Sequence, residues 1–184
     1  EARTAGAFHI ATEQYQRVFK AGVSIEASER ADLLEAYAQA CTVTDRIEEG
    51  ITANLEALAI WRDTGNRERE GACLSKLARC YFISPQPDAA DQASLDAITI
   101  LESLDTPLTL AAAYGTEAML RMLNRDVEDA VRWGWKSFKI AEQFQDATVM
   151  STTLNSIGSA MLFIYYERGC ELLTQSLDIA REAN

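Results

Sequence analysis

The feature that most constrains this chain is an eight-residue pattern that returns at intervals of about forty residues. In its clearest copy, Leu74 and Leu77 are followed by the small residue Ala78 and then by Tyr81. The spacing i, i+3, i+4, i+7 marks one face of an α-helix, with a notch at the small residue where a second backbone can approach. Equivalent residues stand forty positions earlier and eighty positions later: Leu34, Tyr37, Ala38 and Cys41, and Leu154, Ile157, Gly158 and Met161. A helical face that recurs at a long period predicts a solenoid of stacked repeats.

A second helical pattern lies between successive copies of the first and keeps the same register. Its copies begin at Ala57-Leu58, Ala97-Ile98, Ser137-Phe138 and Ser176-Leu177, and Val18-Phe19 precedes them by one further period. We therefore expect an all-α, right-handed superhelical solenoid that forms one domain over residues 1–184, with a period of 39 to 40 residues. Its helix pairs are predicted at 28–64, 66–105, 106–145 and 146–183, and a half repeat is predicted at 6–22.

Composition excludes several classes of protein. The 184 residues are 48% hydrophobic but contain only three prolines and nine glycines, which favours packed helices. A formal net charge of −11 repels phosphate backbones, so we expect no direct contact with nucleic acid. No apolar run approaches the roughly 18 residues of a membrane span. The chain opens on Glu1 rather than methionine, and we expect it to be a fragment of a longer protein.

The four cysteines stand at apolar or small-residue positions of the helical patterns: Cys41, Cys73, Cys80 and Cys170. They form no C-x-x-C pair and have no neighbouring histidine that would complete a metal site. We interpret them as core residues of a cytoplasmic protein, and we expect neither a metal nor a cofactor.

The first-helix pattern resembles the tetratricopeptide repeat, whose first helix reads L-x-x-L-A-x-x-Y and whose second helix carries a small residue where it packs on the first. That small residue corresponds to Gly50, Ala90, Ala130 and Gly169. The chain departs from the family in its longer period, which predicts helices about one turn longer than usual. It departs again in the first helix of the third pair, 106–145, where the charged residues Glu117 and Arg121 replace apolar ones.

Three stretches, 58–82, 114–142 and 154–162, also resemble the repeat region of large LuxR-type bacterial transcriptional regulators. Such proteins carry an ATPase module before the repeats and a helix-turn-helix after them. The resemblance implies a sensor domain that captures a protein or peptide, or a small effector, and relays the signal. The alternative is a generic scaffold for protein–protein interaction in a pathway other than transcription.

Nothing in the sequence indicates catalysis. A phosphate-binding loop requires G-x-x-x-x-G-K-[ST], and Gly65 and Gly71 do not fit that spacing. The single histidine, His9, has no matched nucleophile. An unrecognised hydrolase is therefore the weakest alternative, and we expect no enzyme.

The candidate binding site is the concave groove that first helices line in stacked repeats. We predict its residues by their offset from the notched face: Asp32, Glu35, Gln39, Ser75, Arg79, Phe82, Met119, Met122, Asn155 and Ser159. Methionines at such positions suit an adaptable apolar contact. The competing interpretation is that Phe82, Met119 and Met122 only pack between neighbouring first helices.

Three other features carry predictions. Glu117 and Arg121 are four residues apart and form either a local ion pair or a weak joint in the array. Trp133 and Trp135 point about 200° apart on a helix, so only one of them can lie fully in the core. The last helix has two apolar stripes, Leu173-Leu177-Ala180 and Leu172-Ile179, and one preceding helix to cover them, which predicts a homodimer through this end.

Overall fold

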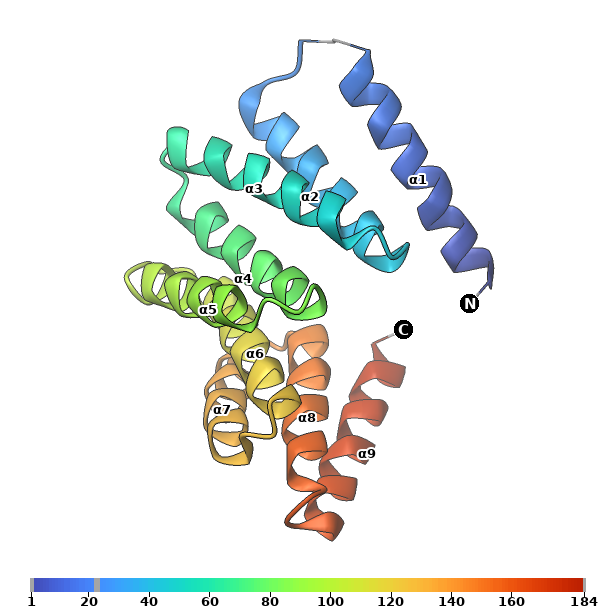
Figure 1. The fold of residues 1–184 in the computed structure, drawn as a ribbon. Coiled ribbons are helices and arrows are strands. Elements are labelled where there is room, and N and C mark those ends of the chain that lie inside the picture. The colour runs from blue at the N-terminus through green and yellow to red at the C-terminus, as the bar shows by residue number, and fades with distance from the viewer. Residues whose placement is uncertain (1, 22–23, 184) are drawn as a thin grey trace. The chain divides into compact units, whose positions relative to one another are not determined.

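The computed structural model describes residues 2–21 and 24–183, and within them the chain forms nine α-helices and no strand (Figure 1). Side chains are described from residue 6 onward. The helices are α1 (Ala2–Lys20), α2 (Ala27–Val43), α3 (Ile47–Asp63), α4 (Arg67–Ile83), α5 (Pro87–Glu102), α6 (Pro107–Leu123), α7 (Val127–Gln143), α8 (Ala147–Met161) and α9 (Tyr166–Glu182). None of the helices in these ranges is long and apolar enough to cross a membrane.

The all-α class and the succession of helix pairs are confirmed. Each predicted pair contains two helices, which are α2 with α3, α4 with α5, α6 with α7, and α8 with α9. The predicted half repeat corresponds to α1, which begins at Ala2 rather than residue 6. Its predicted end at residue 22 lies outside the described residues.

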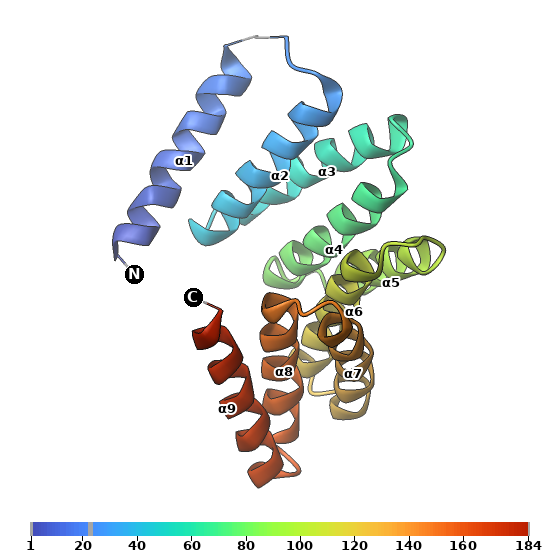
Figure 2. The same ribbon diagram turned by 180° about the vertical axis from the view of Figure 1, so that it is seen from behind.

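The chain divides into two compact units, residues 1–93 and 94–184, with the boundary inside α5. In the first unit α2 packs against α1 and α3, and α3 packs against α4. In the second unit α6 packs against α7 and α8, α7 against α8, and α8 against α9. Figure 2 shows these neighbours from behind.

Short turns separate the helices from α2 to α9, and several helix starts are capped by a side chain. Asn66, Asp126 and Asp146 each accept a hydrogen bond from the backbone N–H three residues later. Gly65 has a φ of 70°, a left-handed conformation that glycine adopts without strain, and it ends α3 where the sequence predicts. Within each unit the chain therefore reverses within a few residues, which lays α3 beside α2, α4 beside α3, α7 beside α6, α8 beside α7 and α9 beside α8.

The notched faces lie in the core, as the pattern predicts. Ala38, Ala78 and Ala118 are at most 1% exposed. A methyl group added at Gly50 would lie 3.1 Å from the backbone oxygen of Ala38, so the small residue of α3 packs directly on the notch of α2. The predicted role of this small residue in bringing the two helices together is confirmed for this pair.

The cysteines occupy core positions in the same way. Cys41, Cys73 and Cys80 are buried, and Cys170 is half-buried. Burial raises the pKa of the Cys73 thiol to about 12, so this thiol stays protonated over the physiological range.

Candidate functional site

Six of the predicted groove residues lie in the first unit, on α2 and α4. Asp32, Gln39 and Arg79 are exposed and Phe82 is half-buried. Glu35 is only 4% exposed and Ser75 is buried as well. The exposed residues remain candidates for ligand contact, whereas Glu35 and Ser75 are buried, and the Ser75 hydroxyl has no hydrogen-bond partner there.

The carboxylate of Glu35 is the centre of a charged cluster that joins three helices. One oxygen accepts a hydrogen bond from the indole N–H of Trp61 on α3 at 2.8 Å. The other accepts from Arg69 at 3.0 Å and from Lys76 at 2.5 Å, both on α4. Arg69 also pairs with Asp32, and its guanidinium lies 4.7 Å from the centre of the Trp61 ring. The acidic and basic charges on this face therefore neutralise one another.

The remaining predicted groove residues lie in the second unit, on α6 and α8. Met119, Met122 and Ser159 are half-buried, and Asn155 is exposed. The structure brings Ser159 and Asn155 together, because the Ser159 hydroxyl donates a hydrogen bond of 3.4 Å to the Asn155 side-chain oxygen. Ligand binding by these residues stays a prediction.

The accessible first-helix residues share one register along the sequence. Gln39, Arg79, Met119 and Ser159 stand forty residues apart, and all four are exposed or half-buried. One turn later stands a large apolar residue that is also exposed, with exposed fractions of 51%, 51%, 44% and 66%: Val43, Ile83, Leu123 and Phe163. We call these last four the exposed apolar set. It was not predicted from the sequence, although its forty-residue spacing just before each turn could have indicated it.

The turn between α8 and α9 is apolar where the other first-to-second-helix turns are polar. Phe163, Ile164, Tyr165 and Tyr166 are 59% to 71% exposed. The equivalent turn between α6 and α7 reads Asn124-Arg125-Asp126. The Arg125 guanidinium lies 5.6 Å from the centre of the Phe163 ring, so it covers only part of this apolar turn. Contiguous exposed apolar residues of this kind mark an interaction site.

The charged pair of the third first helix is an ion pair within α6. Glu117 is 1% exposed, and one of its carboxylate oxygens accepts a hydrogen bond from Arg121 at 2.7 Å. The second oxygen is buried and has no hydrogen-bond donor. The local ion pair is therefore confirmed, and the weak joint stays a prediction.

The two neighbouring tryptophans separate as their spacing predicts. Trp133 is half-buried and packs against a core cluster in which its ring centre lies 5.4 Å from that of Tyr114. Trp135 is 38% exposed and meets Phe138 edge-on. His9 is an exposed residue of α1.

These helix pairs, with their buried notches and accessible first-helix positions, define a helical-repeat protein of the tetratricopeptide-like (TPR-like) class. Among solved structures, the chain is similar to BtubC (BKLC) from P. vanneervenii, with a TM-score of 0.75 and 15% identity over 99% of this chain and 76% of that one. It is also similar to a putative kinesin light chain of Podosopora anserina with nearly identical TPR-like repeats, with a TM-score of 0.66 and 18% identity over 97% of this chain and 90% of that one.

A second structure of the latter protein, which carries a single substitution, gives a TM-score of 0.69 and 19% identity over 97% of this chain and 89% of that one. At these identities the likeness establishes the fold alone. No family model and no curated protein matches the chain.

Proposed function

We propose that this chain is a non-catalytic module that binds a protein or peptide through its first helices. The observation that carries the proposal is the exposed apolar set, Val43, Ile83, Leu123 and Phe163. Within each unit two of these large apolar side chains remain exposed, Val43 and Ile83 in the first and Leu123 and Phe163 in the second, which favours a protein partner that covers them. The accessible residues one turn earlier, which vary from Gln39 to Arg79 to Met119, would supply specificity.

Site-specific photo-crosslinking of the full-length protein in its native cells tests this proposal. A crosslinking residue at Gln39 or Ile83 is expected to give a discrete adduct with a partner protein. A crosslinking residue at Ala59, an exposed position of α3, serves as the matched control and is expected to give none. Equal labelling from all three positions would contradict binding through the first helices.

The finer form of the proposal places the chain in a cytoplasmic, bacterial transcriptional regulator of the LuxR type, where it senses a partner or small effector. The resemblance of 58–82, 114–142 and 154–162 to the repeats of such regulators supports it. The flanking open reading frame distinguishes the two candidates. A nucleotide-binding loop upstream and a helix-turn-helix downstream would support the regulator, and the absence of both would favour the scaffold.

Self-association through α9 is a further part of the proposal. Leu172 and Ile179 pack against Leu154 and Ile157, and Leu173 of the other stripe lies against Gly158 of α8, whereas Leu177 of that stripe is 48% exposed. Light scattering of the purified chain is expected to show a concentration-dependent dimer that Leu177→Glu abolishes. A monomer at every concentration would contradict the dimer.

A further inference from the structure

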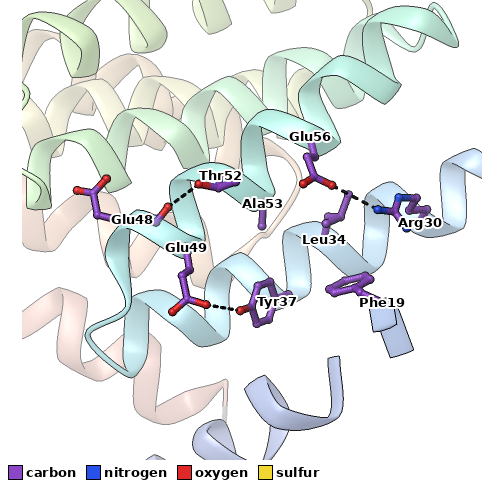
Figure 3. A pocket seen from close by; sticks show the side chains of 9 residues that line it. All are labelled: Phe19, Arg30, Leu34, Tyr37, Glu48, Glu49, Thr52, Ala53 and Glu56. Atoms are coloured by element: carbon purple, nitrogen blue, oxygen red, sulfur yellow. Dashed lines mark hydrogen bonds and ion pairs between the residues drawn. The ribbon is translucent and has the colours of Figure 1, made fainter. Parts of the chain in front are cut away.

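A cavity of about 330 Å³ opens between α1, α2 and α3 (Figure 3). By helical spacing, Asp32 and Gln39 lie on a different face of α2 from Leu34 and Tyr37, which line the cavity. It is lined by Phe19 from α1, by Arg30, Leu34 and Tyr37 from α2, and by Glu48, Glu49, Thr52, Ala53 and Glu56 from α3. Its volume lies at the lower end of the range of small-ligand pockets.

One end of the cavity is closed by the contact that holds α1 on α2. The rings of Tyr15 and Phe19 lie 6.2 Å and 5.7 Å from the ring of Tyr37, measured between centres. Gln16 donates a hydrogen bond of 3.0 Å to the Tyr37 hydroxyl. Tyr37 in turn donates to Glu49 at 2.8 Å, and burial together with this bond raises the pKa of Tyr37 to about 12. The phenol therefore remains a donor, and Glu49 is fully engaged.

The remaining wall combines apolar side chains with two accessible carboxylates. Leu34 and Ala53 are buried and form the apolar floor. Glu56 meets Arg30 at 3.4 Å, a pair in which both side chains are about half exposed. One oxygen of Glu48 accepts from Ser84, and its other oxygen has no described hydrogen bond. Glu48 and Glu56 lie two turns apart on one face of α3, with the short side chain of Thr52 between them.

The copy of this place that lies eighty residues later, in the second unit, is filled, and we call it the second copy. The intervening copy, forty residues later, again has an alanine, Ala93, where Ala53 stands. Ala53 and Leu34 correspond to Trp133 and Tyr114, and Arg30 corresponds to Leu110. In the second unit these three larger or more apolar residues pack with Ile98 and Leu101 in one core cluster. The cavity between α1, α2 and α3 therefore lacks the tryptophan ring that fills the second copy.

The charge at this place is reversed between the two copies. Glu56 corresponds to Lys136, whose ammonium group lies 4.2 Å from the centre of the Trp133 ring and 5.1 Å from that of Tyr114. In the second copy, therefore, α7 itself provides an aromatic ring, Trp133, and a cation three residues later, Lys136. At the matching positions of α3 the first copy has Ala53 and Glu56, and its own cation is Arg30, whose guanidinium pairs with Glu56 and lies 5.7 Å from the centre of the Phe19 ring.

We propose that the cavity between α1, α2 and α3 binds a protein segment that bears an aromatic side chain close to a lysine or arginine. The aromatic ring would occupy the space above Ala53, and the cation would pair with Glu56 or Glu48. This segment would supply what Trp133 and Lys136 supply in the second unit. The proposal does not depend on binding through the first helices, because it concerns another face of α2.

The probe is an end-capped, alanine-based helical peptide with tryptophan and lysine three residues apart. Two matched peptides replace the lysine with glutamate or the tryptophan with serine. We expect the first peptide to shift backbone amide resonances of α1, α2 and α3 saturably, with a Kd on the order of 1 mM. The glutamate peptide is expected to bind at least about threefold more weakly and the serine peptide not at all.

Variants of the chain test the same contacts from the other side. Ala53→Trp, which copies the second unit, is expected to abolish binding, whereas Ala59→Trp on the exposed face of α3 is expected to leave it unchanged. Ala53→Leu gives the same test if the tryptophan variant does not fold. The double variant Glu48→Gln, Glu56→Gln is expected to weaken binding about threefold. The double variant Glu128→Gln, Asp178→Asn changes the net charge equally and is expected to leave binding unchanged.

Three results would overturn the proposal: equal binding of the lysine and glutamate peptides, resonance shifts outside α1, α2 and α3, or unchanged binding to folded Ala53→Trp and Ala53→Leu. None of them bears on photo-crosslinking from Gln39 or Ile83, so the two proposals can fail separately.

Discussion

Replacing Gly169 with alanine is expected to destabilise the contact between α8 and α9 by about 2 to 3 kcal/mol. A methyl group at Gly169 would lie 2.8 Å from the backbone nitrogen of Leu162 and 2.9 Å from the backbone oxygen of Gly158. Because both neighbours are backbone atoms, no rotamer change relieves the overlap, and the two helices must move apart. This cost exceeds the roughly 0.5 to 1 kcal/mol that alanine gains over glycine inside a helix.

Hydrogen exchange measures the effect where it arises. We expect the amides of α9 to exchange faster in Gly169→Ala by about 30-fold or more, which corresponds to a loss of about 2 kcal/mol. Gly6→Ala in α1 is the matched control, because nothing lies within 4 Å of a methyl group there. It is expected to leave stability unchanged or slightly raised. Unchanged exchange in α9 of Gly169→Ala would contradict the close approach of the two helices.

The helix pairs were predictable because their pattern is local and repeated. One face of a helix is defined by two large residues three positions apart and a small residue next to the second. Leu74, Leu77 and Ala78 show this pattern. Glycine or a polar residue at each turn then sets the ends, as Gly65 does after α3. Repetition of one pattern made each copy a test of the others.

The contacts of the candidate site were less predictable because they join residues that are far apart in sequence. Trp61 and Arg69 donate hydrogen bonds to Glu35, from which they are 26 and 34 residues apart in the sequence. Side-chain length and rotamer determine which donor can bond to Glu35, and neither can be read from the sequence pattern. Its offset from the notched helix face predicted that Glu35 lines the groove, but its side chain is buried. The cavity was readable in principle, because Ala53 and Trp133 share a register, but only a comparison of copies residue by residue shows it.

The second large effect is expected at Glu35, where leucine should destabilise the first unit by about 3 kcal/mol. The substitution removes the acceptor of three donors, and the buried N–H of Trp61 is then left without its bond of 2.8 Å. Glu35→Gln retains an acceptor oxygen and is expected to cost about half as much. Denaturant unfolding followed by tryptophan fluorescence measures both. A cost below about 1 kcal/mol for Glu35→Leu would show that the cluster contributes little.

Leucine at another buried first-helix glutamate, Glu117, is expected to change the stability in the opposite direction. Glu117 accepts one hydrogen bond, from Arg121, and its second oxygen is buried without a donor. Removing that carboxylate eliminates an unsatisfied buried group and adds an apolar side chain at a position that Leu77 and Ile157 occupy in other repeats. The Arg121 side chain is 18% exposed, and we expect its guanidinium to turn to water once Glu117 is removed. Glu117→Leu should therefore melt at a higher temperature than the parent, and a lower melting temperature would contradict both this account and the weak joint.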